Sequence, residues 1–127
     1  MGKISVLLAE NVHFESGMVQ KILGNGFSIE KVRTSYEALR AIRYMTSDKT
    51  PLRVVVTDLF LESGPSDGVF LVGAIRGRNP KIPIVIWTAQ PPGSSYVKAA
   101  LSAGANAVVY KGSTGENLRN KVLEIIL

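Results

Sequence analysis

The sequence predicts a doubly wound α/β domain, in which one parallel sheet lies between two layers of helices. Apolar runs with the length of strands alternate along the chain with segments whose apolar residues recur at helical spacing. Most of these strand-length runs are almost wholly apolar, which is typical of strands that helices cover on both faces. At 127 residues, the chain has the length of one domain with a single core.

The first strand and helix are predicted at the start of the chain. Ile4 to Ala9 is an apolar run of strand length. A helix follows, because Phe14, Met18 and Ile22 are spaced four residues apart and so share one helical face. This helix is expected to end at the turn signal Gly24-Asn25-Gly26.

The next elements are a short strand, a helix and a third strand. Phe27 to Val32 is predicted as the second strand, and a helix follows it over about Tyr36 to Met45. The run Val54 to Val56 is the core of the third strand, which leads through Thr57 to Asp58. A loop follows, and its glycines and proline indicate irregular backbone.

The second half of the chain repeats the alternation. We predict a third helix over about Val69 to Ile75, a fourth strand at Ile82–Trp87, and a helix that Ser94 or Ser95 caps and that ends at Ala103. The fifth strand is Ala107–Tyr110. The last helix is expected to begin at Ser113, where Ser113 and Glu116 have the spacing of a capping box.

Right-handed crossovers between these units leave one natural arrangement. A (βα)5 chain with parallel strands is expected to form a flavodoxin-like three-layer sandwich with sheet order 2-1-3-4-5. Residues 1–127 are therefore interpreted as a single domain. Its last residues lie in an apolar helical stretch without a stop signal, which is compatible with a domain cut from a longer protein.

Composition excludes several classes of function. The chain has no cysteine and one histidine, His13, so thiolate chemistry, disulfides and a histidine-based metal site are excluded. No apolar run is long enough to span a membrane or to form a signal peptide, so we expect a soluble, cytoplasmic domain. The net charge of +5 is scattered, apart from Arg76, Arg78 and Lys81. This small cluster is interpreted as a solvated face, and nucleic-acid binding by the segment is not expected.

Polar residues follow four of the predicted strands. Glu10 and Asn11 follow the first, Asp58 the third, Thr88 the fourth and Lys111 the fifth. Since the carboxyl ends of parallel strands lie at one edge of an open α/β sheet, where ligands bind, these residues are expected to meet.

An aspartate at this edge can attack phosphorus to form an acyl phosphate, although a lone strand-end aspartate more often accepts hydrogen bonds from loop amides. A lone lysine or threonine also has an ordinary structural explanation, but together the residues favour phosphoryl chemistry with Mg²⁺.

In these motifs the chain resembles the receiver domain of two-component response regulators over essentially its whole length. The matching stretches, in order, are SVLLAEN (5–11), VVVTD (54–58), PSDG (65–68), PIVIWTA (83–89) and GANAVVYKG (104–112). The resemblance implies that a histidine kinase or phosphotransfer protein phosphorylates Asp58, and that Thr88 and Lys111 contact the phosphoryl group. At most, such a domain catalyses its own phosphorylation and dephosphorylation and is otherwise not an enzyme.

The resemblance also implies a metal and partners. Mg²⁺ would be held by Glu10, Asn11, Asp58 and the backbone carbonyl of Phe60. Binding is expected to be weak, because family members usually have a second acid where this chain has the neutral Asn11. The output would be a C-terminal domain or a separate protein, and a homodimer through the fourth helix, fifth strand and fifth helix is a further candidate.

Other departures keep alternatives open. Val108 stands at the family's aromatic switch position and Gly112 follows Lys111 where proline is common. These features favour a pseudo-receiver that binds partners without phosphorylation. The loop residue Glu62 is either an extra acid at the site or a solvated side chain. A flavin carrier or a phosphatase is a third class, but AENVHFE lacks a phosphate-binding loop, and Phe60 stands where such phosphatases have a second aspartate.

Overall fold

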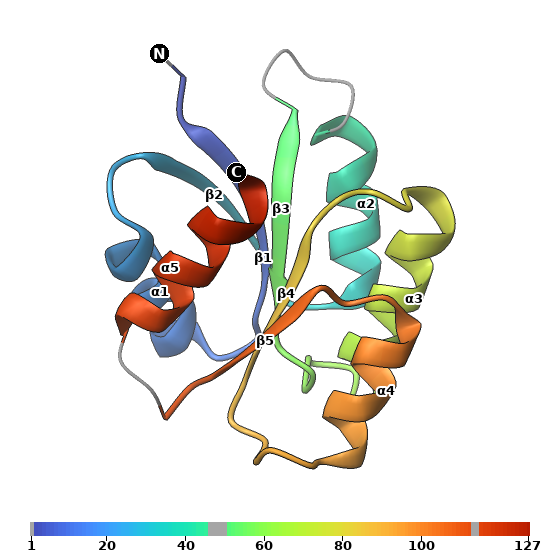
Figure 1. The fold of residues 1–127 in the computed structure, drawn as a ribbon. Helices are drawn as coiled ribbons and strands as arrows, with labels where there is room; N and C mark the ends of the chain where they lie inside the picture. Colours follow the sequence, from blue (N-terminus) through green and yellow to red (C-terminus); the bar gives the residue numbers. More distant parts are fainter. Residues whose placement is uncertain (1, 46–50, 113–114) are drawn as a thin grey trace.

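The computed structural model describes residues 2–45, 51–112 and 115–127, in which strands and helices alternate (Figure 1). The strands are β1 (Ile4–Ala9), β2 (Phe27–Val32), β3 (Leu52–Thr57), β4 (Ile84–Thr88) and β5 (Ala107–Tyr110). The helices are α1 (His13–Leu23), α2 (Ser35–Met45), α3 (Asp67–Arg78), α4 (Ser95–Ala103) and α5 (Gly115–Ile126). Within these ranges no helix is long and apolar enough to cross a membrane.

The five strands form one parallel sheet in the order β2-β1-β3-β4-β5. The predicted order is therefore confirmed. β1 lies between β2 and β3, and its last residue, Ala9, pairs with Val32 on one side and Thr57 on the other. Because Ala9 and Thr57 are in register, the residues that follow them, Glu10 and Asp58, leave the sheet side by side.

Helices cover both faces of the sheet, with α1 and α5 on one face and α2, α3 and α4 on the other (Figure 1). Successive residues of β1 alternate between the two cores. Leu7 packs in the core under α2, α3 and α4, whereas Leu8 packs in the core under α1 and α5, and neither is exposed to solvent. Because helices cover both faces, side chains on either side of a central strand are buried, and burial of one leucine contributes about 2 kcal/mol to stability. This explains why the central strands are almost continuously apolar.

The amino end of α2 is capped from two directions. The Thr34 hydroxyl accepts a hydrogen bond from the Glu37 amide at 3.0 Å, and the Glu37 carboxylate accepts one from the Arg33 amide at 3.0 Å. Asp67, at the start of α3, accepts hydrogen bonds from the Ser35 amide at 3.1 Å and the Ser35 hydroxyl at 2.5 Å. Two orphan amides of the helix start, those of Ser35 and Glu37, are thus satisfied, and α2 is tied to α3.

The start of α3 rests directly on the backbone that carries the strand-end aspartate. The Gly68 amide donates to the Leu59 carbonyl at 3.0 Å. A Cβ atom at Gly68 would lie 2.3 Å from the Asp58 carbonyl oxygen and 2.5 Å from the Leu59 Cα. Both neighbours are backbone atoms, so the close approach requires glycine at this position.

Arg76 fastens the opposite end of the sheet. Its guanidinium donates to the carbonyls of Gly104, Asn79 and Ile82 and to the Asn106 side chain, at 2.8–3.1 Å. We call this set of contacts the Arg76 clasp. The sequence interpretation of Arg76 as part of a solvated basic face was wrong, because the side chain is half-buried and bonded to loop carbonyls.

The predicted boundaries differ most from those in the structure at α3 and β4. Helix α3 begins at Asp67 and continues to Arg78, whereas the expected range was Val69 to Ile75, since the two glycines and two arginines in its outer turns carry no apolar signal. β4 begins at Ile84 rather than Ile82, because Pro83 has no amide hydrogen to donate. The predicted capping residue Ser113 lies outside the described residues.

Candidate functional site

A cavity of about 370 Å³ lies at the carboxyl ends of the strands. Five of the six predicted site residues line it, namely Asn11, Asp58, Phe60, Thr88 and Lys111. The sixth, Glu10, is buried and does not line the cavity, but it accepts a hydrogen bond from Lys111, which does. The parallel strands therefore bring the predicted residues together at one edge of the sheet.

The Lys111 ammonium is bonded to three carboxylates at the centre of this site. Its Nζ lies 3.0 Å from Glu10 Oε2, 2.9 Å from Asp58 Oδ2 and 2.5 Å from Glu15 Oε2. Lysine carries three donors, and each of them has a carboxylate partner here. We call Glu10, Glu15, Asp58 and Lys111 the carboxylate cluster.

The Asp58 carboxylate is fixed from both sides. Its Oδ1 accepts a hydrogen bond from the Leu59 amide at 2.7 Å, and its Oδ2 accepts one from Lys111. The Asp58 amide donates to the Ala9 carbonyl at 2.9 Å, which continues the pairing of β3 with β1. The side chain remains 10% exposed and lines the cavity. A rigid backbone thus presents a carboxylate that solvent can still reach.

The acids of the cluster have different affinities for protons. Burial, together with the negative charge of Asp58, raises the pKa of Glu10 to about 8. For Glu15, burial acts to raise the pKa, but hydrogen bonds with Lys111 and Glu10 lower it overall. Burial acts to lower the pKa of Lys111, yet the bonds to Glu15 and Asp58 raise it. Near neutral pH the cluster therefore keeps a proton on Glu10 while Lys111 stays charged.

β4 supplies an aromatic ring and a hydroxyl. The Lys111 ammonium lies 4.7 Å from the centroid of the Trp87 ring, which is within cation–π range. The Lys111 amide donates to the Thr88 carbonyl at 2.8 Å, and the Thr88 hydroxyl accepts from the Gln90 amide at 3.0 Å. Thr88 therefore lines the cavity with its hydroxyl oriented by the following loop.

Aromatic and aliphatic groups flank the cavity on the α4 side. The Phe60 ring is 37% exposed and meets the Tyr96 ring edge to face, with centroids 5.2 Å apart. Val108 and Tyr110 are half-buried and pack against the core of that face. The position three residues before Lys111 thus holds an aliphatic side chain in a packed environment.

Glu15 is the site residue that sequence reasoning missed. It lies in the first turn of α1, four residues after Asn11 in the sequence. That spacing was the available signal. Glu62, the loop acid considered instead, pairs with Arg33 at 3.3 Å, and both side chains are more than half exposed. The structure therefore favours the interpretation of Glu62 as a solvated side chain.

The donor set of the cluster fits a hard divalent cation. Ligand oxygens from Glu10, Glu15 and Asp58 lie within 4.8 Å of one another. Mg²⁺ prefers carboxylate and carbonyl oxygens, and Asn11 contributes a further amide oxygen to the same cavity. The residues present therefore suit the metal that the resemblance implies.

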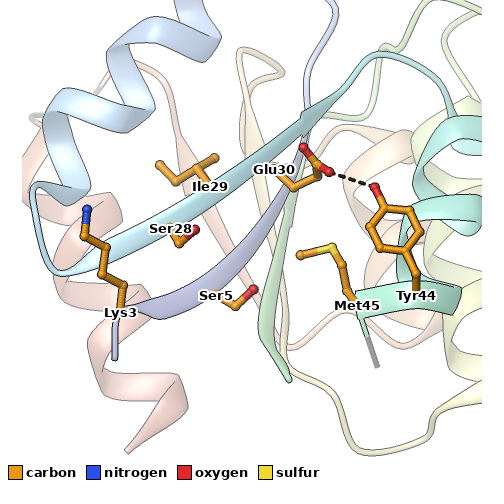
Figure 2. Close-up of a pocket in the computed structure, with 7 residues that line it drawn as sticks. All are labelled: Lys3, Ser5, Ser28, Ile29, Glu30, Tyr44 and Met45. Carbon is orange, nitrogen blue, oxygen red and sulfur yellow. Dashed lines mark hydrogen bonds between the residues drawn. The ribbon is translucent and has the colours of Figure 1, made fainter. Parts of the chain in front are cut away.

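A second cavity, of about 420 Å³, lies at the other end of β1 (Figure 2). It is lined by Lys3, Ser5, Ser28, Ile29, Glu30, Tyr44 and Met45. The only carboxylate in that lining is that of Glu30, which already accepts a hydrogen bond from the Tyr44 hydroxyl at 2.7 Å. Although this cavity is slightly larger, it lacks the converging acids and cation of the first, so we place the chemistry at the carboxylate cluster.

Comparison with protein families identifies one match. The family model for the response regulator receiver domain matches residues 6–123. No curated protein matches the sequence.

Several solved structures are similar to this structure over nearly the whole chain. A putative response regulator from Chloroflexus aurantiacus J-10-fl is 25% identical, with a TM-score of 0.82 and 98% of each chain covered. The receiver domain of the sensor histidine kinase PA1611 from Pseudomonas aeruginosa PAO1, whose structure has a magnesium ion coordinated in the active-site cleft, is 20% identical, with a TM-score of 0.79 and 98% of each chain covered. The phosphorylated cyanobacterial phytochrome response regulator RcpA is 18% identical, with a TM-score of 0.78, and the match covers 98% of this chain and 91% of RcpA.

Proposed function

This chain belongs to the response regulator receiver domain family, and from that premise we propose that it receives a phosphoryl group on Asp58 as a step in two-component signal transduction. The observation that carries the proposal is the position of the Asp58 carboxylate. It lines the cavity at the sheet edge, 2.9 Å from the Lys111 ammonium, on a backbone held by β1 and α3.

The proposed reaction is a single transfer. An Asp58 carboxylate oxygen attacks the phosphorus of a phosphohistidine on a histidine kinase or phosphotransfer protein. The new P–O bond forms as the P–N bond breaks, and the imidazole leaves with the bonding electrons. Lys111 then pairs with a phosphoryl oxygen, since its ammonium already lies against Asp58. The Thr88 hydroxyl, in the same cavity, supplies a hydrogen bond to the phosphoryl group.

Glu10, Asn11, Asp58 and the Phe60 carbonyl are the proposed Mg²⁺ ligands. A divalent cation offsets the negative charge that the phosphoryl group brings beside these carboxylates. The structure of the PA1611 receiver domain contains magnesium in its cleft, which supports the same metal for this chain. The proposal includes no turnover of a separate substrate, beyond the hydrolysis of the acyl phosphate.

The consequence of phosphorylation would be a change on the face formed by α4, β5 and α5. When Lys111 turns to a phosphoryl oxygen, its contacts with Glu10 and Glu15 weaken, and Lys111 directly follows β5. That face would bind an output domain, a separate protein or a second copy of the chain. Val108 is aliphatic, so no aromatic ring at that position reports the change.

The test of this proposal is mass spectrometry of the intact protein after treatment with a small phosphodonor and Mg²⁺. We expect one added phosphoryl group on the wild type and none on Asp58→Asn. A well-characterised receiver treated in parallel controls for the activity of the donor. An unmodified wild type beside a modified control would contradict the proposal.

A pseudo-receiver is the second candidate, and Asn11 and Val108 favour it. In that case the partner would bind the unphosphorylated domain through the same face. Partner binding that is unchanged in Asp58→Ala would support this function. Binding abolished by Asp58→Ala in a stably folded variant would instead support phosphorylation.

A further inference from the structure

Asn11 leaves the site one negative charge short of the usual receiver pattern, and the structure shows another acid in its vicinity. Glu15 lines the same cavity as Asn11 and Asp58. Its carboxylate lies 2.5 Å from the Lys111 ammonium and within 4.8 Å of ligand oxygens from Glu10 and Asp58.

We propose that Glu15 supplies the negative charge that Asn11 lacks, so that Mg²⁺ binding in this receiver depends on Glu15. The inference rests on the proposed function above, because it concerns the metal of that site. Binding of a divalent cation would release the proton that Glu10 keeps near neutral pH, and three carboxylates and one ammonium then leave two excess negative charges. Without Glu15 only one would remain, and the attraction for a divalent cation would be roughly halved.

The position of Glu15 suits this role. It lies in the first turn of α1, and the helix is held there by the Ser16 amide, which donates to the Val12 carbonyl at 3.0 Å. The Glu15 side chain is 29% exposed, whereas that of Glu10 is fully buried. Glu15 is therefore the most solvent-accessible acid of the carboxylate cluster.

A purely structural role for Glu15 makes a different prediction. If Glu15 only paired with Lys111 and did not bind the cation, Glu15→Gln would leave the Mg²⁺ affinity close to that of the wild type. Asn11→Asp would then tighten Mg²⁺ binding by the same factor with and without Glu15. If Glu15 supplies the missing charge, Asn11→Asp replaces it, because Asn11 lines the same cavity.

The experiment is a Mg²⁺ titration followed by Trp87 fluorescence and, independently, by calorimetry. Trp87 is the only tryptophan and contacts the Lys111 ammonium. We expect Glu15→Gln to weaken Mg²⁺ binding by about tenfold or more, and Asn11→Asp in the Glu15→Gln background to restore the wild-type affinity within about threefold. Glu62→Gln is the matched control, because it removes one carboxylate that pairs with Arg33 outside the cavity.

Several results would overturn the inference. These are Glu15→Gln with wild-type Mg²⁺ affinity, a double variant that stays as weak as Glu15→Gln, an equal loss in Glu62→Gln, or a wild type that binds no Mg²⁺. Urea unfolding of each variant confirms that the titrated protein is folded.

Phosphorylation of the same proteins is measured separately. If the wild type accepts a phosphoryl group while Glu15→Gln keeps its affinity, only this inference fails. If Glu15→Gln loses affinity while the wild type accepts no phosphoryl group, only the proposed function fails.

Discussion

A half-buried arginine, Arg76, and a largely buried lysine, Lys111, hold the two ends of this sheet, and they bind different kinds of partner. Arg76 donates to three backbone carbonyls and one side-chain amide oxygen, all of them neutral. Lys111 donates to three carboxylates. Glu10 directly follows β1, Glu15 lies in α1 and Asp58 directly follows β3. One cation therefore contacts main chain that cannot change its charge, and the other contacts side chains that can.

This difference separates stability from function. Backbone carbonyls neither take up protons near neutral pH nor accept phosphoryl groups, so the Arg76 clasp keeps one arrangement under all ordinary conditions. Carboxylates exchange partners among ammonium groups, protons, metal ions and phosphorus. We therefore expect substitutions in the clasp to change the free energy of unfolding, and substitutions in the carboxylate cluster to change binding and pH dependence.

The largest expected effect is that of Arg76→Ala. It leaves the half-buried carbonyls of Gly104 and Ile82 without their donor. We expect the free energy of unfolding to fall by about 3 kcal/mol, measured by urea denaturation. Mg²⁺ affinity of the folded protein should stay the same. A loss below about 1 kcal/mol would show that the clasp is not a main support of the fold.

The second effect is a pH dependence that comes from Glu10. Its pKa is about 8 in the folded chain and near 4.5 when unfolded. The folded state therefore holds this proton more tightly, so its contribution to stability is complete below about pH 4.5 and is lost as the pH rises to about 8. We expect the free energy of unfolding to fall by roughly 3 kcal/mol between pH 5 and 8, and to vary less in Glu10→Gln. Equal slopes in the two proteins would contradict this assignment.

Lys111→Met tests the other cation and should cost less than Arg76→Ala. At pH 6 Glu10 keeps its proton, the Glu15 side chain is partly exposed, and methionine preserves the packing on Trp87. Asp58 loses a buried cation but keeps its hydrogen bond from the Leu59 amide. We therefore expect the free energy of unfolding to fall by about 2 kcal/mol, by the same urea measurement. If Lys111→Met lowered the free energy of unfolding as much as Arg76→Ala does, the two cations would not differ in their contribution to stability.

The smallest effect is expected for Glu62→Gln. The Arg33–Glu62 pair is exposed on both sides, and such pairs contribute about 0.5 kcal/mol or less. Thermal unfolding at low and high salt measures this contribution. A larger effect would mean that the loop between β3 and α3 is held mainly by this pair rather than by the Asp67 bonds to Ser35.

The sequence predicted the architecture because its strongest signal is burial. Residues such as Leu7 and Leu8 lie under opposite helical layers, as expected for a parallel sheet that helices cover on both faces. The ends of α3 and β4 were less predictable. Those boundaries depend on hydrogen bonds such as that from the Ile84 amide to the Asn106 side chain, 22 residues away, and apolar periodicity does not report them.

The site was predicted to the extent that its residues follow strands. Asp58 and Lys111 leave parallel strands at the same edge, so position along the sequence was enough to bring them together. Glu15 lies on a helix, and its contact with Lys111 spans 96 residues. Arg76 could not be distinguished from a solvated arginine, because its acceptors are backbone carbonyls, which every residue carries. Neither the Glu15–Lys111 contact nor the Arg76 contacts can be recognised from the sequence, because folding alone brings these residues together.

Gly68 has a consequence for how freely this sequence can vary. Every residue except glycine carries a Cβ atom, and at this position that atom would overlap the main chain of Asp58 and Leu59. No choice of side chain relieves the overlap, because backbone atoms cannot rotate away. In a library that samples all residues at each position, Gly68 should therefore be as intolerant of change as the proposed phosphoacceptor Asp58, although it takes no part in the proposed chemistry.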